Sequence, residues 1–225
     1  MEEEGDAGEG RERGEVGRKL ALWGVAAAIV VLAAIVGVVS WKGHRKKQDE
    51  SAVVAAVGES TLVLREVLAE KPPLDAVARL DGDLKRTKVS ERTQLAEAAE
   101  DYVLGAREIA RRRADADRLA PPTAAARAAL HAHLAAGARR NDAWFRHAGD
   151  LKKRVEDAHF ELNVSLKALD GLLDGMQESR KRLAPLMGEK QLIEPAALNA
   201  ARERVQGELK RSAEELERAR QIPIG

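Results

Sequence analysis

The segment Glu156-Asp-Ala-His159 places a carboxylate and an imidazole three residues apart, so a helix would point both side chains in one direction. Helical bundles that hold two iron ions use two such pairs together with two further glutamates. No other histidine of this chain follows a glutamate at that spacing. The pattern therefore indicates an ordinary surface or boundary histidine, and we expect no metal site and no cofactor.

The remaining clusters of titratable residues also favour solvated helix faces. His131 and His133 are two residues apart, so on a helix they would diverge by about 200° and could not hold one ion. Asp170, Asp174 and Glu178 recur at every fourth residue and form an acidic stripe that could attract a cation. Because basic residues follow this stripe directly, we interpret it as a solvated face.

Reactive motifs are missing from the sequence. No Gly-rich phosphate loop, nucleophile elbow or kinase signature occurs, and the absence of cysteine excludes thiol chemistry and disulfides. The short basic runs have acids close by and no interleaved aromatic residues, which disfavours nucleic-acid binding. The net charge of +1 does not indicate an acidic binding partner either. We expect a protein that is not an enzyme and does not bind nucleic acid.

The composition favours an all-α fold. Aromatic residues make up 3% of the 225 residues, and the hydrophobic content consists mainly of small and aliphatic side chains. β-Sandwiches and α/β enzymes rely on aromatic and β-branched residues, so both classes are disfavoured. From residue 51 onward the apolar residues keep steps of three and four, which predicts helices. Between Leu130 and Leu183 these steps alternate without a slip, which is the repeat of helices wound around their neighbours.

Prolines and glycines suggest where the helices end. The sequence predicts breaks or connections at Pro72-Pro73, Asp81-Gly82-Asp83, Pro121-Pro122 and Pro185 to Pro195. Between the last two we favour one long helix over residues 123–184, with a break near Gly149 as the alternative. Short connections make successive helices antiparallel neighbours, so residues 51–221 should form an antiparallel helical bundle or coiled coil.

The N-terminal region contains the strongest single feature of the sequence. Residues 20–39 hold no charged residue, and about 20 apolar helical residues are enough to cross a bilayer. Trp23 and Trp41 stand near the two ends, where aromatic rings favour the headgroup level. We predict a single transmembrane helix over residues 20–41, with interfacial side chains at Arg18, Lys19, Trp23, Trp41, Lys42, Arg45, Lys46 and Lys47. A cleaved signal peptide is the alternative, but its apolar run would be shorter.

The segments around this predicted span complete the domain organisation. Residues 1–19 should be a disordered charged tail, residues 42–50 a basic juxtamembrane segment, and residues 222–225 a C-terminal tail. Basic residues are equally frequent near both ends of the span, so the membrane side of the C-terminal region stays open, with a lean toward the cytoplasm. Gly24 and Ala28 stand four residues apart, which would let two spans pack closely.

Two functions are consistent with these features. The first is a single-pass, cell-membrane protein whose helices serve as a structural or protein-interaction module, with a protein partner or a second copy of the chain. The alternative is a sensory or ligand-binding bundle that signals through a separate partner. Trp144 and Phe145, the only adjacent aromatic pair, could either contact a partner or fill the core. The Ala- and Arg-rich composition is typical of a bacterial chain.

Overall fold

The computed structural model describes residues 41, 43–69, 73–89, 92–136 and 141–224. Contacts divide the chain into two units, Met1–Asp49 and Glu50–Gly225. In the first unit, residues 43–49 are helical, and the guanidinium carbon of Arg45 lies 5.3 Å from the ring centroid of Trp41. Trp41 is 60% exposed, and the side chains of Arg45, Lys46 and Lys47 are exposed as well.

The predicted membrane span is almost wholly outside the described residues, as are Arg18, Lys19, Trp23 and Lys42. None of the helices that the structure describes combines the length and the apolar character that crossing a bilayer requires.

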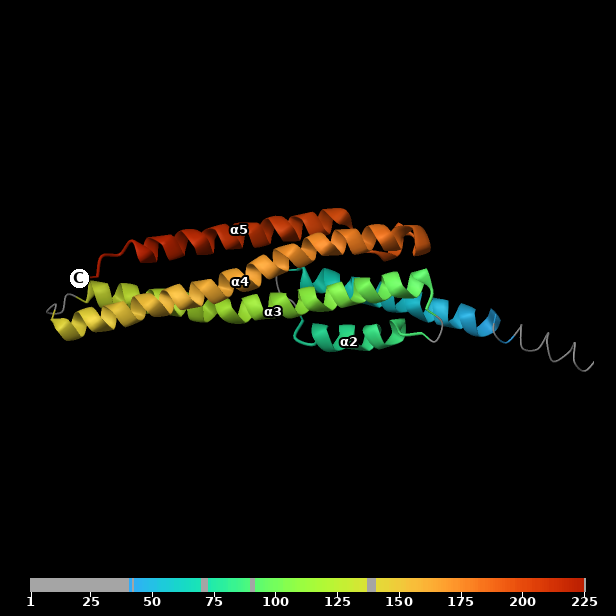
Figure 1. Ribbon diagram of the computed structural model, residues 1–225, viewed down its shortest axis with the longest axis horizontal. Coiled ribbons are helices and arrows are strands. Elements are labelled where there is room, and N and C mark those ends of the chain that lie inside the picture. Colours follow the sequence, from blue (N-terminus) through green and yellow to red (C-terminus); the bar gives the residue numbers. More distant parts are fainter. Residues whose placement is uncertain (1–40, 42, 70–72, 90–91, 137–140, 225) are drawn as a thin grey trace, which may run out of the picture. The chain divides into compact units, whose positions relative to one another are not determined.

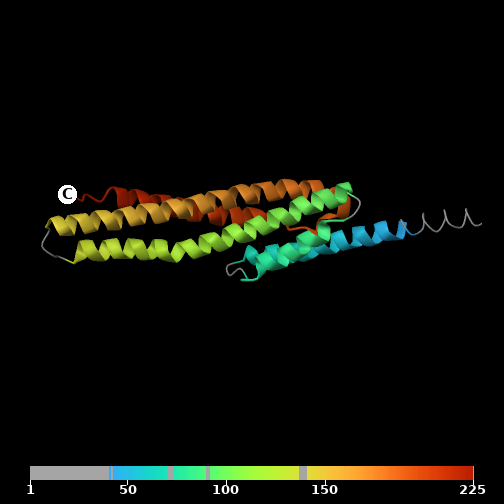
Figure 2. The same cartoon turned by 60° about the horizontal axis from the view of Figure 1, so that its bottom comes forward.

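The second unit is a helical bundle, and its described residues contain no strand. A helix over residues 50–67 is followed by α2 (Ala76–Thr87), α3 (Gln94–Ala135), α4 (Asp142–Met187), the short 3₁₀ helix η1 (Glu189–Gln191) and α5 (Pro195–Arg220). Helices α3, α4 and α5 run lengthwise beside one another with alternating directions (Figures 1 and 2). The predicted all-α fold with antiparallel helices is confirmed.

Helix α4 begins at a specific cap rather than continuing from α3. The side chain of Asn141 accepts a hydrogen bond from the backbone N–H of Trp144 at 2.9 Å, as a helix N-cap residue does. Gly149 lies inside α4. The prediction of one helix over residues 123–184 was therefore wrong, and so was the alternative break near Gly149. A glycine inside a helix costs only about 1 kcal/mol, which the packed face of α4 offsets.

Pro121 and Pro122 lie inside α3, so the prediction that they separate two helices was also wrong. A proline inside a helix removes a backbone hydrogen bond and bends the axis, at a cost of about 3 kcal/mol. Both rings are exposed, and α3 bends along its length in Figure 2. Packing of α3 against α4 on both sides of the two prolines keeps the helix continuous. Pro185 similarly falls within the last turn of α4, which ends at Met187 and is followed by the C-cap residue Gly188 with φ of 91°.

The expected break at Asp81 to Asp83 was wrong for a different reason. These residues lie in the middle of α2, and the side chain of Asp83 is buried. Its carboxylate accepts a hydrogen bond from the Ser60 hydroxyl at 2.9 Å and forms an ion pair with Arg86. The buried hydrogen bond to the distant Ser60, together with the ion pair to Arg86 in the same helix, therefore stabilises as helix a segment whose sequence is typical of a turn.

Buried side chains form two separate apolar clusters along the bundle. The larger one joins the 50–67 helix, α2 and the adjoining parts of α3, α4 and α5, and the smaller one contains Leu130, Leu151, Val155 and Ala219. Within the larger cluster, Tyr102 is fully buried. Its hydroxyl lies 2.9 Å from the Thr61 hydroxyl and accepts a hydrogen bond from the Ile193 N–H at 3.1 Å.

Candidate functional site

A layer of buried polar side chains lies between the two apolar clusters. Thr123 on α3, His159 on α4 and Ser212 on α5 are 4%, 1% and 4% exposed. Polar groups are costly to bury unless hydrogen bonds compensate them, so protein cores seldom place three of them together without a reason. This layer is the point at which the bundle departs from an ordinary helical core.

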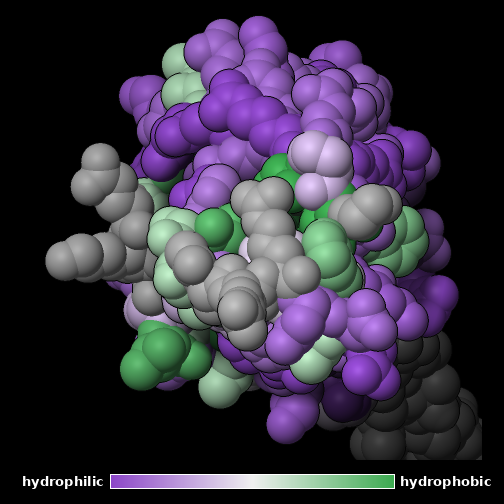
Figure 3. Space-filling view, turned by 90° about the vertical axis from the view of Figure 1, so that its left-hand side faces the viewer, coloured by the Kyte–Doolittle hydropathy of each residue, from purple (hydrophilic) through white to green (hydrophobic). Residues whose placement is uncertain are grey.

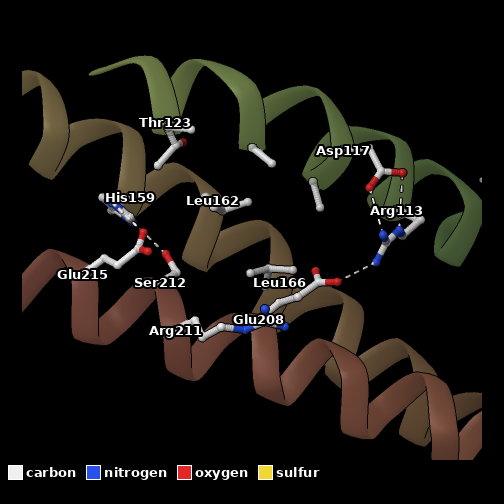
Figure 4. A pocket seen from close by; sticks show the side chains of 13 residues that line it. Arg113, Asp117, Thr123, His159, Leu162, Leu166, Glu208, Arg211, Ser212 and Glu215 are labelled. Carbon is white, nitrogen blue, oxygen red and sulfur yellow. Dashed lines mark hydrogen bonds and ion pairs between the residues drawn. The ribbon is translucent and has the colours of Figure 1, made fainter. Parts of the chain in front are cut away.

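A cleft of about 370 Å³ opens at this layer between α3, α4 and α5, and we call it the central cleft (Figure 4). Its apolar lining consists of Ala116, Ala120, Ala124, Leu162 and Leu166. Its charged lining consists of Arg113, Asp117, Glu208, Arg211 and Glu215. The three buried polar residues complete it. Alanines at every fourth residue of α3 leave the space that larger side chains would fill.

His159 is the buried titratable group of the cleft. Its Nδ1 lies 2.8 Å from the Ser212 hydroxyl, whereas its buried Nε2 has no hydrogen-bond partner among the described residues. The nearest acidic oxygen is Oε2 of Glu215, at 3.9 Å from Nε2, which is beyond hydrogen-bond reach. Figure 4 shows Glu215 and Ser212 on the α5 side of the imidazole.

Burial lowers the pKa of His159 below its ordinary value, because the charged imidazolium is poorly solvated there. The negative charge of Glu215 opposes this shift in part, and the positive charge of Arg127 adds to it. The imidazole is therefore neutral near pH 7, and Nε2 carries either one N–H donor or one lone-pair acceptor.

The charged side chains of the cleft are largely paired with each other. Arg113 donates to Asp117, with 3.3 Å from Nε to Oδ2, and to Glu208, with 3.3 Å from Nη1 to Oε1. Glu215 forms an ion pair with Arg127. Arg211 differs, because its Nε donates to a backbone carbonyl of its own helix and it forms no ion pair with a described acid. The cleft thus holds one unpaired cation and one unpaired buried ring nitrogen.

Ser212, His159 and Glu215 form a series of hydroxyl, imidazole and carboxylate that resembles a nucleophilic triad in its residue types. Two features oppose that reading. The carboxylate is 3.9 Å from the ring nitrogen, and Ser212 lies inside α5, where neighbouring backbone N–H groups are already bonded within the helix. An oxyanion would find no backbone donor at this serine. The arrangement fits binding better than acyl transfer.

The sequence prediction for His159 was wrong in one respect, since the residue is buried rather than at a surface or boundary. It follows buried Val155 by four residues and precedes buried Leu166 by seven, so helical spacing alone could have placed it inside. The polar side chains that lie beside the imidazole are Ser212 and Glu215 of α5, and no contact joins it to Glu156, its partner in the sequence motif, among the described interactions. The described residues include no cluster of three or more histidine, aspartate or glutamate side chains that could hold a metal ion.

Trp144, for which the sequence left both a partner contact and core filling open, is only 9% exposed. Its ring stacks on His133 with centroids 5.0 Å apart, and Phe145, which is half-buried, meets it edge-on at 5.1 Å. Figure 3 looks onto this end of the bundle, where hydrophobic side chains lie among hydrophilic ones. Trp144 therefore packs within its own bundle, and a partner contact at this pair stays a prediction.

The acidic stripe on α4 faces an arginine of α5. Arg202 donates to Asp170 at 3.1 Å and to Asp174 at 2.7 Å, while Glu178 pairs with Lys181 at 2.7 Å. These carboxylates are thus neutralised by protein cations at the surface, where such pairs contribute little to stability.

Lowering the pH should destabilise the fold through His159. Its pKa in the folded chain is below that of the unfolded chain, so the unfolded state takes up the proton first as the pH falls. We expect the free energy of unfolding in urea to decrease between about pH 7 and pH 5, with His159→Asn flattening that decrease. His131→Asn, which changes an exposed histidine, is the control. An unchanged slope in His159→Asn would contradict the prediction.

Comparisons of this chain with protein-family models, with curated proteins and with solved structures find no match.

Proposed function

We propose that this chain is a membrane-tethered, non-catalytic helical bundle that binds a small molecule in the central cleft. The bundle then signals the presence of the bound molecule to a separate partner protein. The observation that carries the proposal is a cleft of about 370 Å³ that is lined in part by His159, whose buried Nε2 has no hydrogen-bond partner among the described residues. Pockets with a few converging polar groups on an apolar lining are the usual form of a ligand site.

The tether is supported by sequence alone. Residues 20–39 are long and apolar enough to span a bilayer, and Arg45, Lys46 and Lys47 follow within reach of anionic headgroups. A single-pass location in the cell membrane of a bacterium is part of the proposal. The side of the membrane on which the helical bundle lies is not part of it. Nothing in the proposed binding role depends on that side.

The position of the cleft supports a signalling role for bound ligand. Its lining comes from three helices, and it separates the two apolar clusters of the bundle. A ligand held there would touch α3, α4 and α5 together, so binding would favour one arrangement of the three helices over others. A partner protein that contacts the surface of these helices could then distinguish the ligand-bound bundle from the ligand-free bundle.

A protein-interaction module is the second candidate, and one observation favours it. Phe160 and Val164, four residues apart on α4, are 66% and 49% exposed. Large apolar side chains on one exposed helix face are typical of a surface that packs on another helix. A second copy of the chain is the occupant we consider, because Gly24 and Ala28 would let two membrane spans pack closely.

A thermal-shift screen of the full-length chain in lipid nanodiscs would test the binding role. A ligand at a hundred times its dissociation constant stabilises a protein by about 2.7 kcal/mol, which corresponds to a shift of several degrees. We expect at least one class of small molecule to raise the Tm of the wild type but not of His159→Asn. If no compound distinguishes the two proteins, the protein-interaction module becomes the better proposal.

A further inference from the structure

The groups that lack partners in the central cleft define the kind of molecule that would complete it. Arg211 forms no ion pair with a described acid, and the Nε2 atom of His159 has no described hydrogen-bond partner. Figure 4 shows the Arg211 side chain extending away from His159, toward Glu208. The two groups thus stand toward different ends of the cleft, with the apolar lining beside them.

The charge of the ligand follows from the ion pairs already present. A cation entering the cleft would have to compete with Arg113 for Asp117 and Glu208, or with Arg127 for Glu215. An anion meets no such competition, because the guanidinium of Arg211 has donors to offer. A planar guanidinium binds a carboxylate with two parallel hydrogen bonds, and one unpaired arginine matches a single negative charge.

At the His159 end of the cleft, the ligand must carry a group that forms a hydrogen bond with the imidazole next to the carboxylate of Glu215. A hydroxyl group can accept a hydrogen bond from Nε2–H and donate its own proton to the carboxylate of Glu215, which lies 3.9 Å away. A hydroxyl can also donate to Nε2 if that atom carries the lone pair. A hydroxyl therefore fits both tautomers of the imidazole, whereas an ammonium group fits only one of them.

The middle of the ligand must be apolar. The cleft lining between its polar ends consists of alanine methyl groups from α3 and of Leu162 and Leu166 from α4. A volume of about 370 Å³ accommodates a single ring or a short aliphatic chain with its substituents. The bend that Pro121 and Pro122 introduce in α3 falls between Ala120 and Thr123, both of which line the cleft.

We propose, on the basis of the binding role above, that the central cleft binds a small hydroxy-substituted monocarboxylate whose apolar body separates the hydroxyl from the carboxylate. Arg211 binds the carboxylate, His159 and Glu215 bind the hydroxyl, and the alanine and leucine side chains contact the body. Recognition is selective because a ligand that lacks the hydroxyl leaves the buried Nε2 unpaired.

Isothermal titration calorimetry of the full-length chain with three matched probes would test this proposal. The probes are para-hydroxyphenylacetate, phenylacetate, which lacks the hydroxyl, and tyramine, which replaces the carboxylate with an amine. We expect para-hydroxyphenylacetate to bind at least about tenfold more tightly than either of the others. Tyramine that binds as tightly as para-hydroxyphenylacetate would overturn the assignment of an anion.

Two variants locate the binding. Arg211→Gln should weaken binding of para-hydroxyphenylacetate about tenfold, whereas Lys210→Gln, the same charge change one residue earlier and outside the cleft, should not. His159→Asn keeps a side-chain atom near the Nδ1 position for Ser212 but removes Nε2, and it should abolish the preference for the hydroxylated probe. Equal effects of Arg211→Gln and Lys210→Gln would contradict the assigned site.

Failure of this proposal and failure of the binding role are separable. If none of the three probes binds, or phenylacetate binds as well as its hydroxylated form, the hydroxycarboxylate assignment is wrong. The binding role would still stand if another class of compound stabilised the wild type and not His159→Asn in the thermal-shift screen. If no compound in that screen distinguished these two proteins, both proposals would fall.

Discussion

Removing residues 1–41 is expected to release almost all of the chain from the membrane fraction of expressing cells. Residues 20–39 carry no charge, and a segment of that length and character partitions into a bilayer essentially irreversibly. The basic residues left behind offer only about 1 kcal/mol each near an anionic surface, which a high-salt wash removes. The measurement is the share of chain that sediments with membranes after such a wash.

A full-length variant separates this effect from simple truncation. Ile29→Arg together with Leu32→Arg places two charges near the centre of the apolar segment, where each costs about 2.5–3.5 kcal/mol of insertion free energy. Glu3→Arg with Glu4→Arg introduces two arginines into the preceding tail instead and should leave the chain in the membrane fraction. If the deletion and the central double variant both stay with membranes after washing, residues 20–41 are not the anchor.

Tyr102→Ala is expected to destabilise the bundle by about 3–5 kcal/mol, the usual range for deleting a buried aromatic ring. The ring is fully buried in the larger apolar cluster, and its hydroxyl joins three segments that are distant in sequence. It contacts the Thr61 hydroxyl and accepts a hydrogen bond from the Ile193 N–H, which ties the connection before α5 to α3. The free energy of unfolding in urea provides the measurement.

Two controls distinguish the contributions of the ring and the hydroxyl. Tyr102→Phe keeps the ring and leaves the buried Ile193 N–H without its acceptor, so a smaller loss of about 1–3 kcal/mol is expected. Leu104→Ala, on the same helix but 43% exposed, should cost clearly less than Tyr102→Ala. A loss in Tyr102→Ala no greater than that in Leu104→Ala would show that this cluster does not stabilise the bundle.

The sequence predicts the helical class and much of the core, but it does not predict the ends of the helices. The steps of three and four correctly place Leu151, Val155 and Leu169 inside the bundle. The boundaries were misjudged because Pro121-Pro122 and Gly149 are weak local breakers when tertiary packing holds both sides. Asn141 falls inside the long helix predicted over residues 123–184, although its short polar side chain is well suited to capping α4.

The central cleft could be predicted only in fragments. The periodicity of α4 could have placed His159 in the core, and its neighbours in sequence, Glu156 and Asp157, drew attention to a metal motif instead. Ser212 and Glu215 lie more than fifty residues later in the chain, and only the packing of α5 against α4 brings them to the imidazole. Contacts between distant segments leave no local pattern in a single sequence.

The most direct test of ligand binding in the central cleft is the imidazole nitrogen NMR spectrum of His159 in the full-length chain. We predict that the compound that most stabilises the protein shifts the Nε2 resonance of His159, because that atom gains the hydrogen-bond partner it lacks. The signals of the exposed His131 should stay unchanged. If the stabilising compound leaves the His159 resonances in place while the fold is intact, its binding site is elsewhere and the central cleft is not a ligand site.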